Sequence, residues 1–229
     1  MFRRPEHQAV AVALKAMNHD WLTACRCWFG GGTEIVLDLD EYRLSKDIDF
    51  LCSDPDGYRK LRLAAASGDV GAFFARDVAL DRPFRSDQHG IRAVIRVGAL
   101  PIRFEIVREA RVTLDGRPDP QLGVPRLSAA DRVAEKLLAN ADHCQDSSTQ
   151  FRDAADLGML ALRLGTFPAE AIAKARYAYG DDIDQKLAWV LTALMDPGRL
   201  AATAAGLGMD AATLDAAIAA LRREARRAT

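Results

Sequence analysis

Two aspartates separated by one residue, Asp47 and Asp49, are the side chains of this sequence best suited to hold a metal ion. Residues two apart in an extended strand face the same side, so both carboxylates project together while Ile48 and Phe50 enter the core. Adjacent carboxylates repel each other unless a cation joins them, and their hard oxygen atoms suit Mg²⁺ or Mn²⁺. The alternative is an exposed strand end with two solvated acids.

A glycine-rich turn, Gly30 to Gly32, precedes these aspartates by about the length of one helix. Glycines lack a Cβ atom, so the backbone can approach a ligand closely, and the amides of a helix beginning near Thr33 favour phosphate. The turn has neither the lysine of a P-loop nor the spacing of a dinucleotide fingerprint. By itself it therefore fits an ordinary chain reversal equally well.

A third carboxylate, Glu105, lies in the alternating segment PIRFEIV. Phe104 and Ile106 are predicted to face the core, which leaves Glu105 on the opposite face together with Arg103. If this strand lies beside the strand of the two aspartates, three carboxylates converge. Such a cluster could hold two metal ions, one activating an attacking hydroxyl and one bridging a triphosphate. Alternatively, Glu105 pairs with a basic neighbour on an open sheet face.

The elements that must position these residues fall into two halves. Short apolar or alternating runs predict strands at CRCWF, DIDFLC, GIRAVIRV and PIRFEIV, the last two forming an antiparallel hairpin. An amphipathic helix with Pro5 in its first turn precedes them, and a helix interrupted at glycines is predicted over 56–75. These signals indicate an α+β domain over residues 1–114.

The second half is helical and rich in alanine. The Gly- and Pro-rich stretch 115–127 is predicted to be a linker, and residues 128–229 an all-helical domain. Ser128 is a suitable N-cap for the first of its helices. Further helices are predicted at 152–164, 168–179, 183–195 and 210–227.

The composition argues against several classes of protein. Among 229 residues the formal net charge is -1, so no global positive field attracts nucleic acid or an anionic membrane, although a local basic groove is compatible with this total. Four cysteines without a CxxC pattern are expected to be reduced thiols. The N-terminal segment lacks the apolar core of a signal peptide, and we expect a cytoplasmic protein without a membrane span.

Four motifs together resemble a known family. GGT is followed after thirteen residues by DID, with RLS before it, which resembles the DNA-polymerase-β-type nucleotidyltransferases. More narrowly, it is similar to the AbiEii/AbiGii abortive-infection toxin family, whose members carry GG[ST] and R-x-S-x-D-[IL]-D-F. DRVAEKLLA and FRDAADLGML, further along the chain, are similar to that family's lysine and RDxxDL motifs. The resemblance covers about residues 28–160.

The resemblance implies a nucleotidyltransferase-type sheet domain and a role for each matching residue. Asp47 and Asp49, with Glu105 as the third acid, would hold Mg²⁺ or Mn²⁺. The ammonium of Lys136 would reach the triphosphate and neutralise charge on the departing pyrophosphate. The other nucleotide-binding residues that it implies are Gly31, Gly32, Thr33, Arg43, Ser45, Arg152, Asp153 and Asp156.

Structural alternatives exist for the residues of the helical half. A helical lysine such as Lys136 is usually a surface residue paired with a nearby acid. Arg152 and Asp156 lie four apart, so a simple ion pair along one helix would also explain them.

The function implied is transfer of a nucleoside monophosphate from an NTP to an acceptor hydroxyl. Within the family the acceptor would be RNA, commonly tRNA, and the partner an antitoxin encoded alongside. The alternatives are an antibiotic-type enzyme with a small-molecule acceptor and a non-catalytic nucleotide-binding module of the same fold. A protein that binds phosphate through its glycine turn alone would leave Asp47 and Asp49 unexplained.

Overall fold

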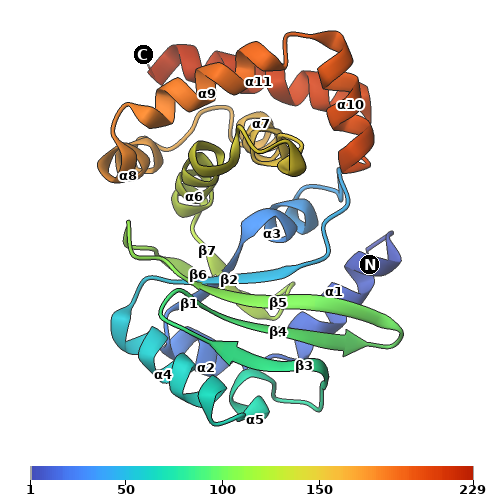
Figure 1. The fold of residues 1–229 in the computed structure, drawn as a ribbon, viewed down its shortest axis with the longest axis vertical. Helices are drawn as coiled ribbons and strands as arrows, with labels where there is room; N and C mark the ends of the chain where they lie inside the picture. Colours follow the sequence, from blue (N-terminus) through green and yellow to red (C-terminus); the bar gives the residue numbers. More distant parts are fainter. Residues whose placement is uncertain (1, 229) are drawn as a thin grey trace. The chain divides into compact units, whose positions relative to one another are not determined.

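The computed structural model describes residues 2–228, and within them the chain forms two compact units (Figure 1). The sheet unit comprises residues 2–37 and 45–128, and the helical unit comprises residues 38–44 and 129–228. The short segment 38–44 thus leaves the sheet unit and joins the helices. A mixed sheet with helices followed by an all-helical part confirms the predicted α+β class.

One sheet orders the sheet unit, and its strand order among the described residues is β3-β4-β5-β2-β1-β7-β6. β2 runs parallel to β5 and β1 parallel to β7, while the other neighbours are antiparallel. The strands are β1 (Cys27–Gly30), β2 (Ile48–Cys52), β3 (Ala79–Ser86), β4 (Gly90–Val97), β5 (Leu100–Arg108), β6 (Gly116–Asp119) and β7 (Val124–Leu127).

Helices cover the two faces of this sheet unequally. Figure 1 shows α1, α2, α4 and α5 on one face and α3 on the other. On the first face, the rings of Phe50 and Phe104 lie 6.2 Å apart in a core that also contains Leu61 from α4. The helices are α1 (Pro5–Ala16), α2 (His19–Ala24), α3 (Gly31–Asp38), α4 (Pro55–Ala66) and α5 (Val70–Phe73).

The helical unit packs around α7 and α6. Gly158 allows α7 to approach α11 closely, because a Cβ atom there would lie 2.6 Å from the carbonyl oxygen of Ala217. The backbone N–H of Leu44 donates to the carbonyl of Leu207 at 3.1 Å, which ties the segment 38–44 to this unit. The elements are α6 (Ala129–His143), η1 (Ser147–Thr149), α7 (Arg152–Leu164), α8 (Ala169–Tyr179), α9 (Asp182–Ala193), α10 (Pro197–Leu207) and α11 (Ala211–Ala228).

The stretch 115–127 differs from its prediction as a linker. It contains β6 and β7, which pair with each other at the end of the sheet. Val124 and Leu127 are buried, and they anchor these strands although the segment is rich in Gly and Pro. Pro118 and Pro125 lie opposite each other, as prolines can in short strands near a sheet edge.

β3 and α10 are among the other elements that were not predicted. Five of the eight residues of β3 are exposed, and its apolar and polar residues do not alternate regularly. The DPG sequence indicated a break, but it begins α10: Asp196 is the N-cap and Pro197 lies in the first turn. Within residues 2–228, no single helix has both the length and the apolar composition of a membrane span; α10 and α11 reach them only as a pair bent by 115°.

Candidate active site

The two aspartates lie where β2 begins. Ile48 and Phe50 are fully buried, whereas Asp47 and Asp49 are partly exposed, as the alternation predicts. β2 and β5 are neighbours, and their parallel register places Asp49 opposite Glu105. The strands that carry the three carboxylates are therefore neighbours, which is the condition on which the three-acid cluster depended.

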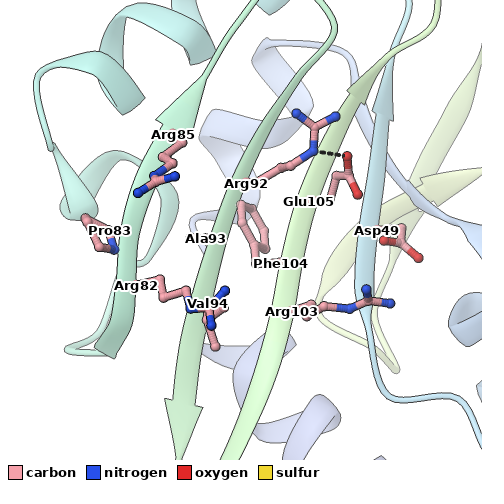
Figure 2. Close-up of a pocket in the computed structure, with 10 residues that line it drawn as sticks. All are labelled: Asp49, Arg82, Pro83, Arg85, Arg92, Ala93, Val94, Arg103, Phe104 and Glu105. Carbon is pink, nitrogen blue, oxygen red and sulfur yellow. Dashed lines mark ion pairs between the residues drawn. The ribbon is translucent and has the colours of Figure 1, made fainter.

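Two arginines contact the outer carboxylates of this set. Nε of Arg103 donates to Oδ1 of Asp47 at 3.1 Å, and a second guanidinium nitrogen contacts Oδ2. Nε of Arg92 lies 2.7 Å from Oε1 of Glu105. A dashed line in Figure 2 marks this ion pair. The hydrogen bond to Asp47, followed by its charge, raises the pKa of Arg103. Glu105 thus has the basic neighbour on an open face that was the alternative to metal binding.

The fit of these acids to a cation depends on the space beside their carboxylates. In the part of the chain that the structure describes, no group of three His, Cys, Asp or Glu side chains is gathered as a metal site. Gly31, however, borders Asp49: a Cβ atom at Gly31 would lie 3.0 Å from Oδ2 of Asp49. The missing side chain leaves room at this carboxylate, and its hard oxygen atoms suit Mg²⁺ or Mn²⁺.

Gly31→Ala should therefore impair the site more than the fold. The substitution places a methyl group against the Asp49 carboxylate, at a backbone φ of +72°. We expect a destabilisation of about 1 kcal/mol from the backbone conformation, together with loss of metal-dependent nucleotide binding. Gly68→Ala is the matched control, because Gly68 has the same φ and open space around it. If both variants change nucleotide binding equally, Gly31 is needed only for the backbone conformation of the turn and not for the space beside Asp49.

The hydroxyls of Thr33 and Ser45 meet beside the glycine turn. Their oxygen atoms lie 2.8 Å apart, and the backbone N–H of Ser45 donates to Nε2 of His7 at 3.3 Å. His7 is fully buried on α1 and acts as an acceptor here. The sequence contains no signal for His7, because a single histidine in an amphipathic helix is typical of many helices. Thr33 and Ser45, both predicted nucleotide-binding residues, are thus brought together.

Four other predicted residues form a group inside the helical unit: Arg43, Lys136, Asp153 and Asp156. Asp156 is fully buried and accepts hydrogen bonds from Nε of Arg43 at 2.7 Å and from the hydroxyl of Tyr42 at 2.5 Å. Nζ of Lys136 lies 2.9 Å from Oδ2 of Asp156 and 2.7 Å from Oδ1 of Asp153. The Lys136 side chain is only 9% exposed, so it is not the surface lysine of the structural alternative. We call Tyr42, Arg43, Lys136, Asp153 and Asp156 the buried ion network.

The network keeps its charges despite its burial. Burial alone would lower the pKa of Lys136, but Asp153 and Asp156 outweigh it and raise that pKa. Burial would likewise raise the pKa of Asp156, yet Arg43 and Lys136 hold it below its usual value. Arg152, by contrast, is exposed, and Asp156 pairs with Arg43 and Lys136 rather than with this residue one turn earlier.

The predicted residues therefore divide between the two units. The sheet unit holds Gly31, Gly32, Thr33, Ser45, Asp47, Asp49 and Glu105, and the helical unit holds Arg43, Lys136, Arg152, Asp153 and Asp156. The sequence motif around RLS crosses this division, since Arg43 and Ser45 belong to different units.

Comparison with known proteins adds a family and a fold. The family model described as "Nucleotidyl transferase AbiEii toxin, Type IV TA system" matches residues 14–227. The crystal structure of JHP933 from Helicobacter pylori is similar with a TM-score of 0.51 and 15% identity, over 99% of this chain and 94% of that one. An antigenic nucleotidyltransferase-like protein from Paracoccidioides brasiliensis gives a TM-score of 0.49 and 13% identity, over 86% and 91% of the two chains. A search of curated proteins found no match.

Proposed function

Because this chain belongs to the AbiEii nucleotidyl transferase toxin family, we propose that it transfers a nucleoside monophosphate from an NTP to a hydroxyl of RNA, with tRNA as the acceptor class. The observation that carries the proposal is the placement of Asp47 and Asp49 on one strand face, with Gly31 leaving space at the Asp49 carboxylate. Two hard carboxylates beside a glycine turn suit a metal-bound triphosphate.

In this reaction the acceptor hydroxyl loses its proton to solvent and its oxygen attacks the α-phosphorus. The bond from that phosphorus to the bridging oxygen breaks, so that pyrophosphate leaves. Asp47 and Asp49 would hold Mg²⁺ or Mn²⁺, which supplies positive charge to the phosphate oxygens. The backbone of Gly31 and Gly32 would approach the phosphates, since neither residue has a Cβ atom. The protein contributes positioning and electrostatic stabilisation rather than a covalent intermediate.

The predicted roles of Asp47, Glu105 and Lys136 compete with their ion pairs in the structure. Asp47 and Glu105 would each become a metal ligand only by exchanging an ion pair for the metal, Asp47 with Arg103 and Glu105 with Arg92. The ammonium of Lys136 contacts Asp153 and Asp156, and these contacts support a structural role beside the predicted one. A further proposal is an antitoxin partner, which is supported by the toxin–antitoxin description of the family.

The test is to incubate the protein with each NTP, labelled at its α-phosphate, together with Mg²⁺ and total RNA. We expect label to migrate with RNA for at least one NTP, and the same reaction with Asp49→Asn to give background. Label in a small-molecule product instead would indicate an antibiotic-type enzyme. No transfer under any condition, with NTP still bound, would indicate a non-catalytic module.

A further inference from the structure

The open face of the sheet unit carries arginines on three neighbouring strands beside the aspartate pair. The register places Arg85 opposite Arg92, and Arg92 opposite Glu105, which in turn lies opposite Asp49. A second row runs from Arg82 through Val94 to Arg103. Figure 2 shows both rows crossing β3, β4 and β5. We call this surface the arginine face; its basic residues are Arg82, Arg85, Arg92 and Arg103.

An irregularity in β3 is what brings Arg82 and Arg85 to the same face. Residues three apart in a regular strand point to opposite sides. The pairing of β3 with β4 shifts between these two residues, so both oppose residues of one β4 face, Val94 and Arg92. Bulges of this kind re-aim side chains, and here the result is two exposed cations side by side.

The charges of this face are incompletely balanced. Arg92 pairs with Glu105 and Asp87, and Arg103 pairs with Asp47. Neither Arg82 nor Arg85 has a carboxylate partner within the described part of the chain. Like charges directly opposite each other on a sheet destabilise it, and Arg85 lies directly opposite Arg92. An anionic ligand would balance the charges of Arg82 and Arg85.

The arginine face also lines a hollow of about 600 Å³ that extends to Asp49. Its volume is in the range of ligand pockets, about 300–1,000 Å³. The ten residues that line the hollow include four arginines, Arg82, Arg85, Arg92 and Arg103. The one aromatic residue of its lining, Phe104, is buried and faces the core, so it offers no surface on which a base could stack. The guanidinium groups of the hollow are therefore suited to phosphate groups.

We propose that the arginine face binds the phosphodiester backbone of the acceptor RNA, with Arg82 and Arg85 contacting phosphates upstream of the reacting hydroxyl. The inference rests on the proposed function and adds the place where its acceptor binds. Asp49 and Arg85 lie on β2 and β3, three strand spacings apart, which is about 14 Å. This span is measured between the strand backbones, and successive phosphates of a polynucleotide cover it. Contacts to phosphate alone make the binding tolerant of sequence.

The test compares Arg82→Gln/Arg85→Gln with Arg59→Gln/Arg62→Gln. The control pair is likewise exposed and three residues apart, but it lies on α4, which covers the opposite face. Binding of a fluorescently labelled tRNA mixture is measured by anisotropy at several salt concentrations. The Arg82/Arg85 variant should bind about tenfold more weakly at low salt and lose about 1.4 from the slope of log K against log salt, because two phosphate contacts are removed.

Transfer kinetics separate this inference from the proposed function. The Arg82/Arg85 variant should raise KM for tRNA and leave KM for NTP unchanged, and the control should change neither. A wild-type protein that transfers nucleotides to tRNA, with a variant of normal tRNA affinity and salt slope, would overturn the inference and leave the function intact. A variant that raises KM for NTP instead would assign the hollow to the nucleotide. If the wild-type protein transfers no nucleotide to RNA, the proposed function is wrong. If the Arg82/Arg85 variant then also binds tRNA as tightly as the wild-type protein, the arginine face is not an RNA-binding surface.

Discussion

Asp49→Asn should lower the rate of nucleotide transfer by about 10²–10³-fold or more and leave the unfolding temperature unchanged or slightly raised. The amide keeps the size of the side chain but removes the charge that a metal ion requires. In the folded protein Asp49 lies beside Asp47 and opposite Glu105, so neutralising it also removes repulsion between carboxylates. Activity and thermal unfolding are measured on the same preparation.

Asp47→Asn provides the internal comparison for this prediction. Asp47 pairs with Arg103, whose side chain is 74% exposed, and exposed pairs contribute at most about 1 kcal/mol. We therefore expect an equal loss of transfer with a small loss of stability. Arg103→Gln removes the same ion pair and keeps both carboxylates, so it should retain far more activity than Asp47→Asn. A large fall in the unfolding temperature of Asp49→Asn would contradict the prediction and make Asp49 a structural residue.

Asp156→Ala should destabilise the protein by about 3–5 kcal/mol, because it leaves Arg43 and Lys136 buried without their common partner. Asp184→Ala is the control in the same unit: Asp184 pairs with Arg176, and about a third of each side chain is exposed. Its loss should cost at most about 1 kcal/mol. Both values are measured by denaturant unfolding at neutral pH.

The pH dependence of stability checks the same network. The pKa of Asp156 is lower in the folded state than in the unfolded chain, so its stabilising effect is present above the unfolded value near 4. This effect is lost as the pH falls through the folded pKa. The difference in unfolding free energy between wild type and Asp156→Ala should therefore shrink below about pH 4. A difference of less than about 1 kcal/mol at neutral pH would show that the network contributes little.

Local patterns were enough to predict the strands of the sheet unit that carry the acids. The alternation around Asp49 and around Glu105 fixes which side chains face the core, and both predictions are confirmed. The four quoted motifs also identified the family, which the match over residues 14–227 confirms. The roles of the individual residues in binding metal and nucleotide stay predictions.

Long-range pairing explains what could not be predicted. Arg43 and Asp156 are 113 residues apart, and no local pattern shows that segment 38–44 joins the helical unit. In the sequence Asp156 lies one helical turn from Arg152, so an ion pair between these two residues was the alternative to nucleotide binding. β3 was missed for a related reason, since its face is charged and its pairing is irregular. The unpaired arginines of that strand became visible only once the register was known.

The most direct measurement of the central claim compares two labels in the same NTP. The protein is incubated with Mg²⁺, tRNA and an NTP labelled either at the α-phosphate or at the γ-phosphate. If nucleotide transfer occurs at Asp47 and Asp49, the α-label enters tRNA and the γ-label is released as pyrophosphate. Asp49→Asn should abolish both the labelling of tRNA and the release of pyrophosphate. Entry of the γ-label into tRNA, or undiminished transfer of the α-label by Asp49→Asn, would contradict the account.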